Sequence, residues 1–121
     1  MAYDVPAADR IRKQLAAHAG LVERKMMGGI CFMLDGHMTC GVTGDSLLVR
    51  VGREDYEASL ARPHTKPLEF GGRRPTGFIL VEPAGYRTEK ALATWIERAR
   101  RFVATLPASA KSPAKRSKRK P

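Results

Sequence analysis

The sequence predicts an α+β fold with two layers, in which helices pack on an antiparallel sheet of about five strands in the order α-βββ-α-ββ-α. Three observations support this class. The turn sequences Asp35-Gly36 and Gly44-Asp45 separate alternating apolar stretches, as in β-hairpins. Two later apolar stretches have the length of strands. Helical spacing of apolar residues occurs before, between and after these strands.

Residues 4–20 are predicted to form the first helix. Ile11 and Leu15 lie four residues apart, which places them on one helical face. Asp4 suits the start of the helix, and Gly20 suits a C-terminal cap.

Residues 31–51 are predicted to form a three-stranded meander. With a turn at Asp35-Gly36, Cys31 lies directly opposite Cys40, and the second turn places Val42 opposite Leu47. Opposed residues share a face of the sheet, so the two hairpins together sort the side chains. The predicted apolar core face holds Cys31, Met33, Met38, Cys40, Val42, Leu47, Val49 and Val51. The mixed face holds Phe32, Leu34, His37, Thr39, Gly41, Thr43, Leu48 and Arg50.

The rest of the folded part is predicted as a helix over 52–61, strands over 68–70 and 77–82, and a helix over 88–106. The stretch from Phe78 to Val81 is continuously apolar, so we expect a helix or a partner subunit to cover its second face. Thr88 suits the N-cap of the last helix. The apolar stripe of that helix comprises Leu92, Trp95, Ile96, Ala99, Phe102, Val103 and Leu106.

The net charge of +10 is unevenly distributed along the chain. Residues 107–121 hold six of the 22 Lys and Arg residues and no acid, whereas residues 1–106 carry a net charge of only +4. The same segment has no large apolar side chain, so we expect a folded domain over 1–106 and a disordered basic tail over 107–121. The basic residues of the tail are Lys111, Lys115, Arg116, Lys118, Arg119 and Lys120.

The tail is the best candidate for a nucleic-acid-binding segment. Its Ser112-Pro113-Ala114-Lys115 stretch resembles the DNA-binding repeats of linker-histone tails, and basic arms of this kind follow phosphates without reading sequence. A solubilising tail that binds polyanions weakly is the alternative interpretation. The loop with Arg73 and Arg74 is a second candidate phosphate contact, although a solvated surface loop is the better interpretation.

Cys31 and Cys40 are predicted to be two small core residues, and a redox-sensitive pair is the alternative. A Cys–His dyad would need a histidine beside a thiol, and the predicted register puts His37 on the opposite face from both. The glycine pairs match no nucleotide-binding loop. We therefore expect no catalytic, cofactor-binding or metal-binding residues, no small-molecule substrate and no enzyme activity.

Several segments together resemble one known family. They are Met1-Ala2-Tyr3-Asp4, Lys25-Met26-Met27-Gly28-Gly29, Met38-Thr39-Cys40-Gly41-Val42, Leu48-Val49-Arg50-Val51-Gly52, Tyr56-Glu57-Ala58-Ser59-Leu60-Ala61-Arg62-Pro63 and the Gly77-Phe78 strand before the Trp95 helix. In this order and spacing they resemble the TfoX N-terminal domain family over residues 1–106. The resemblance implies an α+β fold like that of type III secretion chaperones, and a role in bacterial competence and transcription. Full-length regulators carry a second, helical domain where this sequence has its basic segment.

The remaining expectations concern partners and location. No apolar run approaches the roughly 20 residues of a membrane helix, and the first residues do not look like a signal peptide. We therefore expect a cytoplasmic regulatory module with no membrane contact. Its tail would bind nucleic acid, and its body would contact a protein partner or a second copy. The alternative is a protein-interaction adaptor that has no nucleic-acid role.

Overall fold

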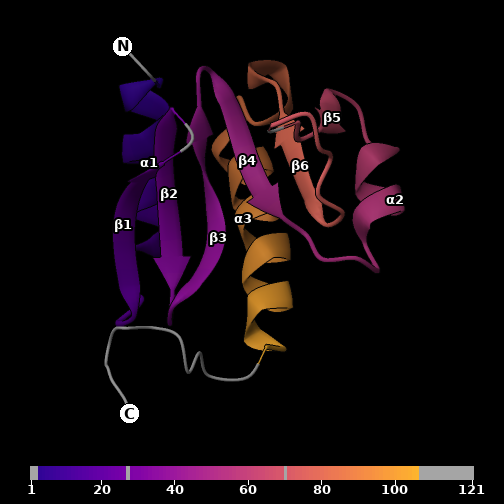
Figure 1. Ribbon diagram of the computed structural model, residues 1–121. Helices are drawn as coiled ribbons and strands as arrows, with labels where there is room; N and C mark the ends of the chain where they lie inside the picture. Colours follow the sequence, from indigo (N-terminus) through magenta and orange to yellow (C-terminus); the bar gives the residue numbers. More distant parts are fainter. Residues whose placement is uncertain (1–2, 27, 70, 107–121) are drawn as a thin grey trace.

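The computed structural model describes residues 3–26, 28–69 and 71–106 (Figure 1). The elements are α1 (Val5–Leu15), β1 (Leu21–Met26), β2 (Gly29–Leu34), β3 (His37–Thr43), β4 (Ser46–Arg50), α2 (Tyr56–Leu60), β5 (Thr65–Pro67), β6 (Phe78–Val81), the 3-10 helix η1 (Pro83–Gly85) and α3 (Glu89–Ala104). The six strands form one antiparallel sheet in the order β1-β2-β3-β4-β6-β5. The predicted α+β class is confirmed, with six strands where about five were expected. The predicted tail over 107–121 lies outside the described residues.

The extra strand is β1, at one edge of the sheet. Its residues Glu23, Arg24 and Lys25 are consecutive charges, so no alternation of apolar and polar residues marks it as a strand. Exposed charges are typical of edge strands, where they discourage pairing with other chains. Strand β1 fills residues 21–26, between the predicted first helix and the predicted meander, and α1 itself ends at Leu15, five residues before the predicted end at Gly20.

The predicted register of the second hairpin is confirmed, and that of the first is correct only beside its turn. Val42 lies opposite Leu47 as expected. In the first hairpin a β-bulge follows the pair Met33–Met38, with Thr39 as the extra residue. Beyond the bulge, Phe32 pairs with Cys40, so the predicted opposition of the two cysteines is wrong.

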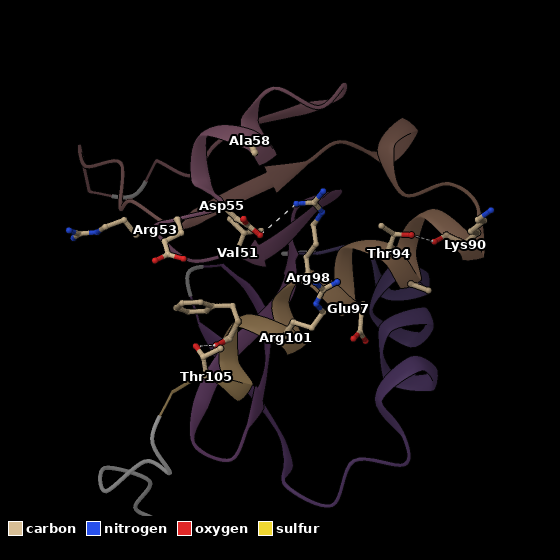
Figure 2. A pocket seen from close by; sticks show the side chains of 13 residues that line it. Val51, Arg53, Asp55, Ala58, Lys90, Thr94, Glu97, Arg98, Arg101 and Thr105 are labelled. Carbon is tan, nitrogen blue, oxygen red and sulfur yellow. Dashed lines mark hydrogen bonds and ion pairs between the residues drawn. The ribbon is translucent and has the colours of Figure 1, made fainter.

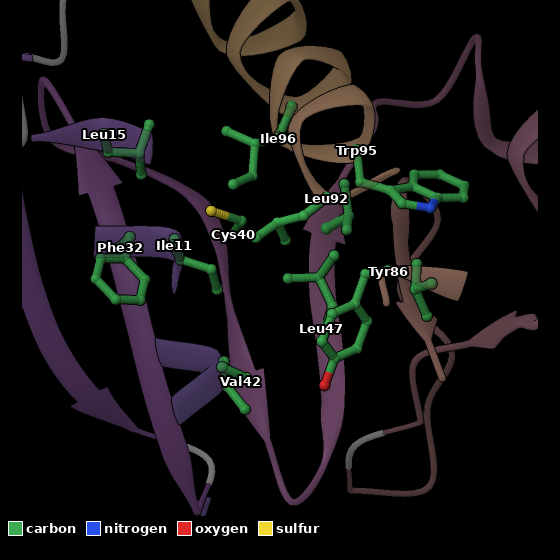
Figure 3. Close-up of a cluster of buried hydrophobic side chains, with 14 of the residues drawn as sticks. Ile11, Leu15, Phe32, Cys40, Val42, Leu47, Tyr86, Leu92, Trp95 and Ile96 are labelled. Atoms are coloured by element: carbon green, nitrogen blue, oxygen red, sulfur yellow. The ribbon is translucent and has the colours of Figure 1, made fainter. Parts of the chain in front are cut away.

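The bulge changes which face each side chain of β2 occupies, because a one-residue shift reverses the alternation. Phe32 and Leu34, expected on the mixed face, are buried in the main core. Cys31 and Met38, expected in the core, belong to a second apolar cluster on the other face with Leu48. Figure 3 shows the main core, in which the labelled side chains are Ile11, Leu15, Phe32, Cys40, Val42, Leu47, Tyr86, Leu92, Trp95 and Ile96.

Two glycines show why β2 and β3 lie so close together. A Cβ atom at Gly41 would overlap the carbonyl oxygen of Ile30 and lie 3.0 Å from the Cα atom of Cys31. A Cβ atom at Gly29 would overlap the carbonyl oxygen of Val42 in the same way. Only glycine therefore permits this separation of the two strands.

Helices α1 and α3 cover the core face of the sheet, behind β1 to β4 in the view of Figure 1. Thr88 caps α3 as predicted, since its Oγ1 accepts a hydrogen bond of 3.0 Å from the amide of Ala91. Five of the predicted stripe residues are buried: Leu92, Trp95, Ile96, Ala99 and Val103. The polar ends of the aromatic core residues are also satisfied, because Trp95 Nε1 donates to the carbonyl of Gly85.

The elements between β4 and α3 are displaced from their predicted positions by a few residues. Helix α2 is shorter than the expected 52–61, and β5 precedes the expected strand over 68–70. Strand β6 lies within the predicted 77–82, but its second face is only partly covered, and by neighbouring side chains instead of the expected helix or partner subunit. Ile79 and Val81 face the main core, while Phe78 and Leu80 pack in the second cluster, which is formed by side chains of the sheet and by Leu68.

Because β2 lies so close to Gly41, a methyl group at this position is predicted to destabilise the fold strongly. We expect Gly41→Ala to lower the free energy of unfolding by about 2 to 3 kcal/mol, as for an overpacked core. Gly72→Ala is the matched control, because a Cβ atom there meets open space and only its φ of +78° is unfavourable. The free energy of unfolding of this control, measured in the same urea titration, should fall by about 1 kcal/mol. An equal or smaller loss for Gly41→Ala would contradict the proposed role of this glycine.

An ion pair joins α1 to the edge strand β1. Arg12 Nε and Nη2 donate to the two carboxylate oxygens of Glu23 at 2.6 and 2.8 Å, and Arg12 also contacts Asp9. The hydrogen bond from Arg12 holds the pKa of Glu23 below its ordinary value. The paired carboxylate therefore stabilises the fold above the unfolded-state pKa of about 4.3, and this contribution is lost as the pH falls through the lowered folded value.

We expect Glu23→Gln to lower the free energy of unfolding by up to about 1 kcal/mol at pH 7, because a half-exposed pair is partly screened by water. The difference from wild type should shrink as the pH falls through the lowered pKa of Glu23, because the wild-type carboxylate is then protonated. Glu54→Gln serves as the control, since that carboxylate has no ion pair with a described residue. A loss that persists unchanged in acid would show that packing, and not charge, explains the effect.

Candidate functional site

An open groove of about 1270 Å³ lies between α2 and α3 (Figure 2). Its apolar lining comes from Val51, which directly follows β4, from Ala58 of α2, and from Ala93 and Phe102 of α3. The charged lining comprises Arg53, Glu54, Asp55, Lys90, Glu97, Arg98 and Arg101. The groove therefore combines small apolar side chains with a rim of both charges.

The polar face of α3 forms one side of this groove. Lys90, Thr94, Glu97 and Arg101 follow one another at intervals of three or four residues, so they form a single stripe on the helix. The opposite stripe of the same helix is buried in the core. The packing of α3 on the sheet thus decides which of its side chains line the groove.

Gly52 and Arg50 hold Phe102 in place at one end of the groove. Gly52 has a φ of +89°, and a Cβ atom there would overlap the Phe102 ring. The Arg50 guanidinium lies 5.4 Å from the centres of both the Phe78 and the Phe102 rings, in the range of cation–π contacts. Burial lowers the pKa of Arg50.

The charges of the groove divide into paired and unpaired groups. Arg98 Nη1 lies 3.9 Å from Asp55 Oδ2 and donates to Ser59 Oγ, and Glu97 pairs with Arg100 at 2.9 Å. Among the described residues, the side chains of Arg53, Lys90 and Arg101 have no hydrogen bond or ion pair. Figure 2 shows Arg53 and Lys90 at opposite ends of the groove, with Arg101 between them.

A comparison with known protein families shows the family to which this chain belongs. The family model of the TfoX N-terminal domain matches residues 13–103. The chain belongs to the TfoX N-terminal domain family. No curated protein and no solved structure matches it. The resemblance stated from the sequence is therefore confirmed, and the expected likeness to type III secretion chaperones stays a prediction.

Arg73 and Arg74, the second predicted phosphate contact, differ in their surroundings in this TfoX N-terminal domain. Both are exposed on the loop before β6, but Arg74 Nε donates to Glu69 Oε2 at 2.7 Å. Among the described residues only the Arg73 side chain of this pair is without an ion pair. The loop ends beside the groove, because the carbonyl of Gly77 accepts the amides of Val51 and Gly52 at 2.8 and 3.2 Å.

The other predicted nucleic-acid-binding residues lie outside the described part of the chain. They are Lys111, Lys115, Arg116, Lys118, Arg119 and Lys120. The groove itself was missed, because its two sides are more than 30 residues apart in sequence. The 3–4 spacing of Lys90, Thr94, Glu97 and Arg101 was the available signal, but a solvated helix face has the same pattern.

Cys31 and Cys40 are free thiols with 1% and 0% of their surface exposed. They lie on opposite faces of the sheet. Burial raises the pKa of Cys31, and burial together with the nearby Cys31 raises the pKa of Cys40 to about 12. A thiolate is therefore disfavoured at both positions, as expected for core residues.

The described residues of this TfoX N-terminal domain contain no group of three or more His, Cys, Asp or Glu side chains arranged to hold a metal ion. Within the same residues, no helix is long and apolar enough to cross a membrane.

The burial of the thiols predicts slow alkylation. At pH 8 we expect both cysteines to react with iodoacetamide at least about a hundredfold more slowly in the folded protein than in denaturant, because so little thiolate is present. Mass spectrometry of peptides containing Cys31 or Cys40 would measure each rate separately. Rapid labelling of either thiol in the folded protein would revive the redox interpretation.

Proposed function

We propose that this protein is a non-enzymatic regulatory module whose basic C-terminal segment associates with nucleic acid. The observation that carries the proposal is the charge of residues 107–121, which hold six Lys and Arg residues and no acid. Membership of the TfoX N-terminal domain family supports a regulatory role. We further propose that it acts in the bacterial cytoplasm, in the regulation of competence or transcription.

The chemistry of the segment favours contact with phosphates over contact with bases. Each lysine or arginine that neutralises a phosphate releases a condensed counterion, which makes the affinity strongly salt-dependent. The segment contains no aromatic residue on which a base could stack. We therefore propose binding without sequence preference, which would raise the local concentration of the folded domain near nucleic acid.

The non-enzymatic part of the proposal is supported by the state of the nucleophiles. Both thiols are buried, and their raised pKa values disfavour the reactive thiolate. The carboxylates Asp55 and Glu97 of the groove are engaged by Arg98 and Arg100, as is usual for surface ion pairs.

A protein-interaction adaptor without a nucleic-acid role is the second candidate. The half-buried Phe78 and Leu80 on the outer face of β6 favour it, because a partner or a second copy could cover them. Ile79 and Val81 are not available for such a contact, since both are fully buried in the main core.

The proposed nucleic-acid contact predicts a steep dependence on salt. If all six basic residues of the tail meet phosphates, the logarithm of the association constant for a DNA duplex should fall against the logarithm of salt with a slope of about −5. In a full-length variant with Lys111, Lys115, Arg116, Lys118, Arg119 and Lys120 replaced by Gln, binding should be almost lost. Fluorescence anisotropy of a labelled duplex measures both quantities.

The control variant carries Gln at Lys13, Arg24 and Lys25, which are exposed cations of the folded part. Its slope should stay close to that of the wild type. A slope unaffected by the tail substitutions would exclude the tail as the nucleic-acid contact, and absence of binding by the wild type would leave the adaptor as the better explanation.

A further inference from the structure

We propose that the groove between α2 and α3 binds a segment of another protein that presents apolar side chains together with acidic ones. This site is separate from the tail, and its function does not depend on nucleic-acid binding. The proposal rests on three features of the groove: its apolar floor, its unpaired cations and its carboxylates.

The floor has room for side chains from a partner. Ala58 of α2 and Ala93 of α3 are the small residues on its two sides, and Val51 and Phe102 close one end. Because alanine side chains end at Cβ, neither helix fills the space between them. Grooves of this kind between two helices accept the apolar side of a peptide.

The unpaired cations call for acidic groups in the same partner. Lys90 lies in the first turn of α3 and Arg101 in its last, which separates them by about 16 Å along the helix axis. Arg53 extends the set to the α2 side. An extended segment of about five residues or a helix of about three turns spans this distance, so one short segment can meet all three cations.

The carboxylates of the groove argue against a nucleic-acid backbone as the occupant. Asp55 and Glu97 already engage Arg98 and Arg100, and Glu54, which has no ion pair with a described residue, would repel a continuous row of phosphates. A protein segment places its acids at separate positions and offers amide donors between them. Phosphates also leave an apolar floor unfilled.

The chain's own basic tail does not match the groove either. Residues 107–121 contain no acid to meet Arg53, Lys90 or Arg101, and no large apolar side chain to fill the floor. Charge and apolar content both indicate a partner that contains the acidic and large apolar residues that the tail does not have.

A library of random 16-residue peptides displayed on phage tests the site in the full-length protein. We expect selection on the wild type to enrich peptides that contain Asp or Glu together with Leu, Ile or Phe. Selection on Ala58→Trp, which fills the floor from an exposed position of α2, should not recover them. Recovery of peptides without acids, equal recovery on both proteins, or no enrichment over a blank surface would overturn the proposal.

Affinity measurements on the most enriched peptide, synthesised with a fluorescent label, locate the contact. We expect Arg101→Glu to weaken binding about tenfold. Arg24→Glu is the matched control, since Arg24 is also an exposed arginine without an ion pair to a described residue but lies on β1, opposite Cys31 in the sheet register. The control should bind within about twofold of the wild type, and circular dichroism checks that every variant is folded.

Three further outcomes separate this proposal from its competitors. The tail variant with six Gln substitutions should keep its affinity for the peptide even if it loses its affinity for DNA. Peptide binding and nucleic-acid binding can therefore fail independently. Displacement of the peptide by a DNA duplex would identify the groove as a nucleic-acid site and overturn the proposal. A wild-type dimer that Ala58→Trp converts to a monomer would show that a second copy occupies the groove, which also overturns it.

Discussion

The close contact of β2 with β3 determines how the rest of this fold is arranged. Gly29 and Gly41 allow the two backbones to approach to a distance that no other residue would permit. The bulge at Thr39 then reverses the alternation along the hairpin, so that Phe32 and Leu34 face the helices. These large side chains give α1 and α3 an apolar surface on which to pack.

Helix α3 connects this core to the groove. One of its faces is buried against β3 and β4, and the other lines the groove beside α2. Phe102 belongs to both regions, because it packs against the core cluster and also closes the groove beside Gly52. The rigid packing of α3 therefore fixes the positions of Lys90 and Arg101, which a flexible loop would not do.

The parts of the fold that the sequence predicted well are those governed by local rules. The hairpin at Gly44-Asp45 and helix α3 follow from turn residues, capping and apolar spacing. The bulge could not be predicted in this way, because it appears only in the pairing of β2 with β3, which turn residues and apolar spacing do not fix beyond the turn. Strand β1 was missed since it is held by pairing with β2 and not by an apolar pattern of its own.

The same distinction explains which site residues were found. A cluster of charges within one segment, such as Arg73 and Arg74, is visible in the sequence, but its pairing with Glu69 is not. The groove needs Arg53 and Arg101 from segments that only the folded chain brings together. Charge counts alone cannot reveal such a surface, because paired and unpaired cations contribute equally to the total.

Two chemically different regions of the protein thus present cations to a ligand. Residues 107–121 carry cations without acids or large apolar groups, a composition suited to a polyanion of uniform charge. The groove carries cations among carboxylates and apolar side chains, which suits a ligand of mixed character. Because neither region matches the ligand of the other, a single molecule could engage a nucleic acid and a protein segment at once. A regulatory module that brings a protein to nucleic acid requires this combination of surfaces.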